Sequence, residues 1–193
     1  MLQPRYLLHT GEGDRFGEAV HHIDVYAFDS LGIYRKMFRD KGAHLKNGYR
    51  MPIDLPEGKW TFLCLGGKVG DYEIGIFKTG IPQQFSPAVS PGITTLSDFR
   101  VKAYFEQKEN LEYSLGELFF GRLDSVEITA DNGGTGVVDL MKNTNKIEVR
   151  VKGIADGSSA RITSDNGRFN SENVTPADAG TIIYVPYYLS LIH

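Results

Sequence analysis

The chain has 193 residues, of which 41% are hydrophobic and 23% are charged, and its formal net charge is −3. This composition excludes a mainly disordered chain, and the slightly negative charge argues against nucleic acid as a partner. The single cysteine excludes an internal disulfide. Glycine is enriched, at 22 residues, which indicates many turns and therefore short strands.

No apolar run is long enough for a membrane-spanning helix, and residues 1–6 carry no apolar signal core. Two locations therefore stay open. Either the protein is cytoplasmic, or it is exported and its signal was cleaved or lies outside this sequence.

The first half of the chain predicts strands at 6–8 and 23–28. The second of these is rich in β-branched and aromatic residues and ends at a turn over 29–32. Residues 35–46 are basic and predict a solvated loop or hairpin arm, with contact to an anionic surface polymer as the alternative. Residues 60–65 are apolar on both faces, which predicts a central strand covered on two sides. The cations of the basic stretch are Arg35, Lys36, Arg39, Lys41 and Lys46.

The middle of the chain predicts a strand at 101–105 and then a short helix within 111–119. The helix is predicted because Leu111, Leu115 and Leu118 fall on one helical face. No longer amphipathic helix is predicted anywhere in the chain.

Two hairpins and one isolated strand are predicted after this point. The apolar segments 126–128 and 137–140 flank the Asn- and Gly-rich turn 131–136, which is typical of a hairpin tip. Residues 146–152 alternate apolar and charged side chains and predict a half-buried antiparallel strand. The Asp-Asn-Gly sequence at 165–167 predicts a second hairpin tip.

These elements predict an all-β protein, a β-sandwich with Greek-key connections, because many short strands occur with few helices. A parallel α/β sheet is excluded because its crossover helices are missing. We predict that 1–152 form a first β-sandwich domain and that 153–193 begin a second β domain.

The tail after Gly153 has only about 40 residues, and chains of that size rarely fold alone. It therefore packs on the first domain, belongs to a larger domain, or is completed by another chain. Its apolar end, 181–192, is predicted to add to a sheet edge in its own chain or in another.

A phosphate-binding loop is not predicted, although the Gly-Glu-Gly-Asp segment 11–14 follows a predicted strand. The position that holds the third glycine of a dinucleotide fingerprint is Phe16, and no Gly-Lys-Ser/Thr follows. The segment is interpreted as a turn, and no cofactor is predicted.

A metal site is not predicted either. His21 and His22 are adjacent, so on a strand they point to opposite faces and cannot bind one ion together. Cys64 lies inside an apolar strand, where a lone cysteine behaves as a small hydrophobic residue. The other histidines are scattered along the chain at His9, His44 and His193.

No catalytic residue is predicted, and the protein is not expected to be an enzyme. The chain has no Gly-x-Ser-x-Gly elbow, and its cysteine is not at a helix N-terminus. A glycosidase-type pair of carboxylates on a β-sandwich stays open, because the two acids need only lie close in space.

Several motifs, taken in order and spacing, resemble a known family. They are 24–29 followed by Gly32, 49–62 followed by Gly66 and Gly67, 118–121 and 142–147, with flanking motifs at 14–16 and 165–169. This pattern resembles the fimbrillin-associated anchor and tip proteins of Bacteroidetes, which belong to the type V pilus system, and it covers roughly residues 5–170.

The resemblance implies a lipoprotein with two transthyretin-like β-sandwich domains at the outer membrane or on a fimbria. It implies that the chain anchors, caps or initiates the polymer, or acts as a tip adhesin toward a host or bacterial surface ligand. The implied partners are other fimbrial subunits, above all the major pilin, and the implied means of assembly is strand addition. Two departures are that the lipidated cysteine is missing and that the chain ends about 40 residues into the second domain.

Two tripeptides, 29–31 and 124–126, place a serine between an aspartate and an aliphatic residue. This is similar to the O-glycan acceptor pattern of exported Bacteroidetes proteins, with plain turns as the alternative.

A surface carbohydrate-binding module is the competing function. It needs exposed aromatic side chains on which sugar rings can stack, whereas Trp60 is predicted to be buried. The tyrosines available for this role are Tyr34, Tyr49, Tyr72, Tyr187 and Tyr188.

Overall fold

Strands dominate the computed structural model of the protein. It describes residues 1–8, 12–78, 84–103, 110–111, 115–131, 134–145, 147, 149, 162–177 and 179–184. The strands of the first part are β1 (Leu2–Tyr6), β2 (His22–Phe28), β3 (Tyr34–Lys41), β4 (Gly58–Gly67), β5 (Tyr72–Lys78), β6 (Gln84–Ser86) and β7 (Phe99–Ala103). They are followed by β8 (Asn110–Leu111), β9 (Leu118–Ile128), β10 (Gly136–Lys142), β11 (Ile162–Ser164), β12 (Arg168–Asn170) and β13 (Ile182–Tyr184). The short helix α1 (Phe16–Ala19) and a 3-10 turn (Val69–Asp71) complete the described elements.

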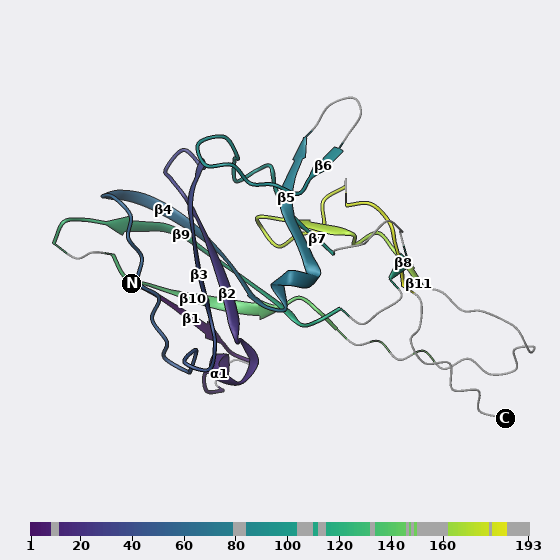
Figure 1. The fold of residues 1–193 in the computed structure, drawn as a ribbon, viewed down its shortest axis with the longest axis horizontal. Helices are drawn as coiled ribbons and strands as arrows, with labels where there is room; N and C mark the ends of the chain where they lie inside the picture. Colours follow the sequence, from purple (N-terminus) through teal and green to yellow (C-terminus); the bar gives the residue numbers. More distant parts are fainter. Residues whose placement is uncertain are drawn as a thin grey trace, which may run out of the picture.

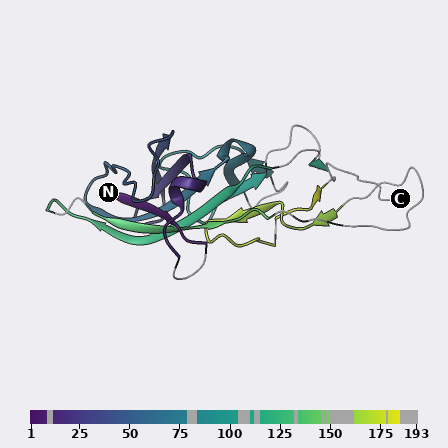
Figure 2. The same cartoon turned by 90° about the horizontal axis from the view of Figure 1, so that it is seen from below.

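The described strands form three sheets (Figure 1). The largest has six strands in the order β1-β10-β9-β4-β2-β3, and all its neighbours are antiparallel except β1 and β10. A four-stranded antiparallel sheet has the order β12-β7-β5-β6, and a small sheet has the order β11-β13-β8. Seen from below in Figure 2, β8 and β11 lie beyond one end of the six-stranded sheet.

The central strand β4 buries side chains on both faces of the six-stranded sheet. Trp60, Phe62 and Cys64 belong to one apolar cluster, whereas Leu63 and Leu65 belong to the other. The prediction of a doubly covered strand at 60–65 is therefore confirmed, and with it the all-β sandwich.

Different parts of the chain cover the two faces. The four-stranded sheet covers one face, where Phe99 and Val101 of β7 pack with Leu63 and Leu65. On the other face, α1 and the connection from β3 to β4 supply buried side chains such as Phe16, Leu45 and Met51. This connection carries the chain past β2, so that β4 pairs with β2 and not with β3.

The hairpin predicted at 131–136 is confirmed, because β9 and β10 are antiparallel neighbours. The turn at 165–167 does not form the predicted hairpin. It leads from β11, which pairs with β13, to β12, which pairs with β7 in another sheet. A turn sequence predicts that the chain changes direction but does not fix which strand each arm pairs with.

Three other predicted elements are wrong in part. The first strand is Leu2–Tyr6 and not 6–8, because the buried positions alternate with Gln3 and Arg5 and not along an apolar run. The helix predicted within 111–119 is not formed, because Leu111 ends β8 and Leu118 begins β9. The first residues of β9 are buried on both faces of the strand, so the spacing of the leucines only resembles that of a helical face. Residues 112–114 lie outside the described residues.

The strand predicted at 146–152 is not formed at the residues that can be described. Ile147 is 72% exposed and Val149 is 58% exposed, and neither belongs to a strand. Alternation produces a half-buried strand only where a neighbouring strand pairs with it, and no described strand does so here. The rest of 146–152 lies outside the described residues.

The tail supplies short strands to two sheets. β12 pairs with β7, so residues beyond 153 extend the four-stranded sheet. Ile182–Tyr184 pairs with β8 and β11 of the same chain, and residues 185–192 lie outside the described residues. The division into domains at residue 152 stays a prediction.

Replacing Gly67 by alanine is expected to destabilise the fold by roughly 1–3 kcal/mol. Gly67 ends β4 with φ +89°, and an added Cβ would lie 2.3 Å from the Glu117 carbonyl oxygen. Gly70→Ala is the matched control, because a Cβ there meets nothing within 4 Å. Urea unfolding of both variants measures this loss. Equal urea midpoints would contradict the close approach of residue 67 to the Glu117 carbonyl oxygen.

Candidate functional site: the edges of the six-stranded sheet

The described residues hold no group of three His, Cys, Asp or Glu side chains that could bind a metal ion. His22 contacts Asp24 at 2.9 Å and His44 contacts Asp40 at 2.9 Å, so each histidine is paired with a single carboxylate. Burial raises the pKa of the Cys64 thiol, which disfavours the reactive thiolate. His9 and His193 lie outside the described residues.

Gly11, in the segment 11–14 interpreted as a turn, lies outside the described residues. The carboxylate of Asp14 accepts hydrogen bonds from the N–H groups of Tyr6 (3.0 Å) and Phe16 (2.9 Å). Phe16 is fully buried. The side chain of Asp14 therefore holds the chain that leads from β1 into α1.

The three described tyrosines suggested for sugar stacking, Tyr34, Tyr49 and Tyr72, are buried or half-buried. Tyr34 and Trp60 are buried. Tyr49 stacks on Phe16, and the hydroxyl of Tyr72 donates to the Gly116 carbonyl oxygen at 3.0 Å. Tyr187 and Tyr188 lie outside the described residues.

A groove of about 540 Å³ contains the carboxylates of Asp29 and Asp54. Burial works to raise the pKa of Asp29, but hydrogen bonds from Ile33, Arg35 and Leu31 outweigh it and lower the pKa. Asp54 is fully exposed and lies 3.5 Å from the Lys36 Nζ. A glycosidase's general acid needs a raised pKa, so Asp29 does not suit that role.

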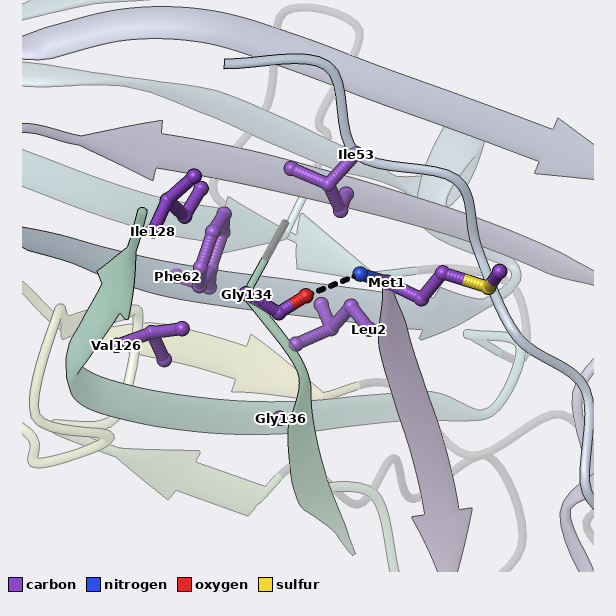
Figure 3. A pocket seen from close by; sticks show the side chains of 8 residues that line it. All are labelled: Met1, Leu2, Ile53, Phe62, Val126, Ile128, Gly134 and Gly136. Atoms are coloured by element: carbon purple, nitrogen blue, oxygen red, sulfur yellow. Dashed lines mark hydrogen bonds between the residues drawn. The ribbon is translucent and has the colours of Figure 1, made fainter. Parts of the chain in front are cut away.

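A second, very small cavity lies beside the N-terminus (Figure 3). Its volume is about 10 Å³, and its lining includes the side chains of Leu2, Ile53 and Phe62. The amino group of Met1 donates a hydrogen bond to the Gly134 carbonyl oxygen at its rim. The space fits a single water molecule at most and cannot hold an organic ligand.

The two serines in acceptor-like tripeptides lie in different settings. Ser30 is in the turn after β2, where Asp29 accepts hydrogen bonds from the N–H groups of Leu31 (2.9 Å) and Ile33 (3.0 Å). Ser125 is not in a plain turn: it lies within β9, at a register shift between β4 and β9, with φ +58°.

The basic stretch is mainly the strand β3, which pairs antiparallel with β2, so the predicted hairpin arm is confirmed and the solvated loop is wrong. Met37 and Phe38 between the cations pack on opposite faces of the sheet. Arg35 contacts Asp29 at 2.6 Å. Arg39 forms two hydrogen bonds, of 2.7 and 2.6 Å, with the fully buried carboxylate of Asp24. Lys41 and Lys46 are exposed.

The outer edge of β1 is closed by the chain itself. The N–H of Leu2 donates to the Met51 carbonyl at 3.0 Å, and the N–H of Met51 donates back at 2.8 Å. Pro4 has no N–H to offer. The N–H of Tyr6 is bound to Asp14, and its carbonyl accepts the N–H of Arg15 at 2.8 Å. A new strand cannot pair here without displacing these groups.

The outer edge of β3 is open over most of its length. Its first residue, Tyr34, is covered, because it bonds through its backbone to Thr94 and Gly92. At the other end, the N–H of Gly42 donates to the carbonyl oxygen of His21, beside β2. In an antiparallel pair, the backbone groups of successive residues point alternately toward and away from the partner strand. With this register, the N–H and C=O groups of Met37 and Arg39 point away from β2. Within the described part of the chain, no strand pairs with that side of β3.

A polar cluster fixes the loop that follows β3. The Asp40 carboxylate accepts hydrogen bonds from the Tyr49 hydroxyl at 2.5 Å and from the ring of His44 at 2.9 Å. The bond from Tyr49, followed by that from His44, lowers the pKa of Asp40. The cluster therefore holds the end of the open edge against residues 44–49.

This cluster predicts a loss of stability in acid. A carboxyl with a lowered pKa in the folded state stabilises the protein above its ordinary pKa of about 3.9, and this contribution is lost as the pH falls through the lowered value. Asp40→Asn should therefore be less stable than wild type at pH 6, and the difference should shrink below about pH 4. Thermal unfolding between pH 2 and 7 measures this, and a difference that does not depend on pH would contradict it.

No described helix is long and apolar enough to cross a bilayer.

The sequence profile of the fimbrillin-A associated anchor proteins Mfa1 and Mfa2 matches residues 1–190. The chain belongs to this family. The resemblance inferred from the motifs at 24–29 and 49–62 is therefore confirmed. Both motifs include parts of the six-stranded sheet, since 24–29 contains most of β2 and 49–62 leads into β4.

Solved structures share the fold. A candidate polysaccharide-binding protein from Bacteroides thetaiotaomicron matches with a TM-score of 0.73 at 19% identity, over 98% of this chain and 65% of that chain. A candidate adhesin from Bacteroides ovatus matches with a TM-score of 0.72 at 25% identity, over 97% and 62%. The fimbrial anchor protein Mfa2 from Porphyromonas gingivalis matches with a TM-score of 0.60 at 18% identity, over 95% and 64%.

The chain thus spans less than two thirds of the length of each of these structures. A comparison with curated proteins found no match.

Proposed function

We propose that the protein is a minor subunit of a type V fimbria at the cell surface, in an anchor or tip position, and that it joins other subunits by β-strand addition. The proposal is carried by the family match over residues 1–190. The fold supports it, because a six-stranded sheet with one closed and one open edge offers a defined place for a partner strand.

The proposed role is mechanical and involves no catalysis. The described residues hold no group of three His, Cys, Asp or Glu side chains that could bind a metal ion, and Cys64 is buried in β4. Backbone pairing can supply both affinity and directionality in a polymer. The partners in this proposal are the major pilin and other fimbrial subunits.

The proposal includes export and attachment to the outer membrane through a lipid on a residue other than those described. Cys64 is unsuitable as the attachment point, because it is fully buried in β4. An adhesive contact with a host or bacterial surface ligand is a further part of the same role.

Co-sedimentation tests the proposal. The purified full chain, added to fimbriae sheared from its source bacterium, is expected to pellet with the fimbriae and to remain soluble without them. Bovine serum albumin serves as a control for trapping. A chain that stays in the supernatant with fimbriae present would overturn the assignment as a fimbrial subunit.

A further inference from the structure

We infer that the β3 edge is the acceptor site and that it takes an extended, acidic segment of a partner subunit as an added strand. This inference rests on the proposed function, since it specifies where strand addition occurs and which partner chemistry fits.

The backbone of β3 provides the pairing groups. The N–H and C=O groups of Met37 and Arg39 point away from β2, and the nearest covered position is Tyr34. The N–H of Lys41 is bound to the Asp40 carboxylate at 2.7 Å, which limits the open segment at its far end. The open edge therefore runs from about 36 to 40, enough for a short strand that pairs at two residues.

The side chains of β3 determine what kind of strand fits. Met37 and Phe38 are half-buried on opposite faces of the sheet, so an apolar residue beside either one would extend a core cluster. Lys36 and Arg39 remain about half exposed, with 45% and 52% of their side chains accessible, although both have partners. Lys41 is exposed as well.

Acidic side chains on the added strand would complement these cations. Opposite charges in cross-strand positions are favourable, whereas like charges directly opposite each other are unfavourable. Cations along an edge also deter addition of an uncharged apolar strand. The acid of β3, Asp40, already accepts hydrogen bonds from Tyr49 and His44. An acidic strand therefore fits the β3 edge better than a basic one.

A second copy of this chain fits the edge less well. If two β3 strands paired antiparallel around a two-fold axis near 37–39, each register would place two cations opposite each other. The opposed pairs would be Arg35 with Lys41, Arg35 with Arg39, or Arg39 with its own copy. The register centred on residue 38 also places Lys36 opposite Asp40, but the carboxylate of Asp40 already accepts hydrogen bonds from Tyr49 and His44. The occupant that complements the edge is therefore a different segment, rich in Asp or Glu.

Two substitutions separate the backbone argument from the charge argument. Met37→Pro removes the outward N–H without removing a bond to β2, and Met37→Ala keeps that N–H and is the matched control. Lys36→Glu combined with Lys41→Glu reverses the charge and leaves Arg39 bound to Asp24. Thermal unfolding of each variant confirms that the fold is retained.

The probe is a short labelled peptide of alternating valine and glutamate, and the control peptide has lysine in place of glutamate. Fluorescence anisotropy with the full chain should show binding of the acidic peptide that weakens with salt. We expect Met37→Pro and the double charge variant each to weaken binding at least about tenfold, and Met37→Ala to change it little.

Equal binding of both peptides, or unchanged binding by Met37→Pro, would overturn the inference. A wild-type dimer in sedimentation that Met37→Pro abolishes would overturn it in favour of self-association. Co-sedimentation with fimbriae separates the two claims. If wild type and both β3 variants pellet equally, the assignment of the β3 edge as the acceptor site is wrong, while the assignment as a fimbrial subunit stands. If wild type does not pellet, the fimbrial assignment itself fails.

Discussion

Replacing Phe99 by alanine is expected to lower the free energy of unfolding by about 3–5 kcal/mol, because it leaves a cavity between the two larger sheets. Phe99 belongs to β7 and is fully buried. Its ring makes edge-to-face contacts with Tyr26, at 5.2 Å between centroids, and with Phe28, at 5.9 Å. These rings come from β2, so the cavity would separate the layers of the sandwich.

Urea unfolding followed by circular dichroism measures this loss. Ile93→Ala is the control, because Ile93 is largely exposed and its truncation should change stability little. A loss for Phe99→Ala below about 1 kcal/mol would mean that the four-stranded sheet does not contribute to a shared core.

Replacing Arg39 by methionine is expected to destabilise the protein by about 3 kcal/mol, at the lower end of the range for a broken buried pair. The side chain of Asp24 is fully buried, and Arg39 supplies two of its hydrogen bonds. Without Arg39, the contact with His22, at 2.9 Å, is the side-chain hydrogen bond that remains to this carboxylate among the described residues. The estimate stays low because Arg39 itself is half exposed.

The double variant Asp24→Leu with Arg39→Met distinguishes an unpaired charge from lost packing. It removes the buried carboxylate together with its partner, so we expect it to be more stable than Arg39→Met alone. Chemical unfolding of the wild type, both single variants and the double variant gives the coupling energy. A double variant that is less stable than either single variant would contradict this account.

The β9–β10 hairpin could be predicted because Val126 and Ile128 alternate with polar residues before a turn sequence, whereas β2 and β4 could be predicted from short apolar runs bounded by turn residues. Residues 60–65 are the clearest example, since burial on both faces appears directly as an apolar run. β1 was misplaced because its buried positions include Pro4, which does not count as a strand former. The cations of β3 obscure the apolar positions Met37 and Phe38, so the sequence leaves a loop and a hairpin arm open for this stretch.

The edges could not be predicted from the sequence, because an edge is defined by which strand is missing next to it. The closure of the β1 edge depends on Met51, which is distant from β1 in the sequence, and on Asp14, which lies in the loop after β1. The pair of Asp24 and Arg39 depends on the register of β2 against β3. One signal was present: Asp24 is a charged residue inside the apolar segment 23–28, and such a residue needs a partner when buried.

Hydrogen–deuterium exchange of the full chain, with and without fimbriae, tests most directly whether subunits join through the backbone of the open edge. Bound fimbriae are expected to slow exchange at the amides of Met37 and Arg39, while the amides of β1 keep the protection they already have. Unchanged exchange along β3 in a chain that is nevertheless bound to fimbriae would contradict this expectation.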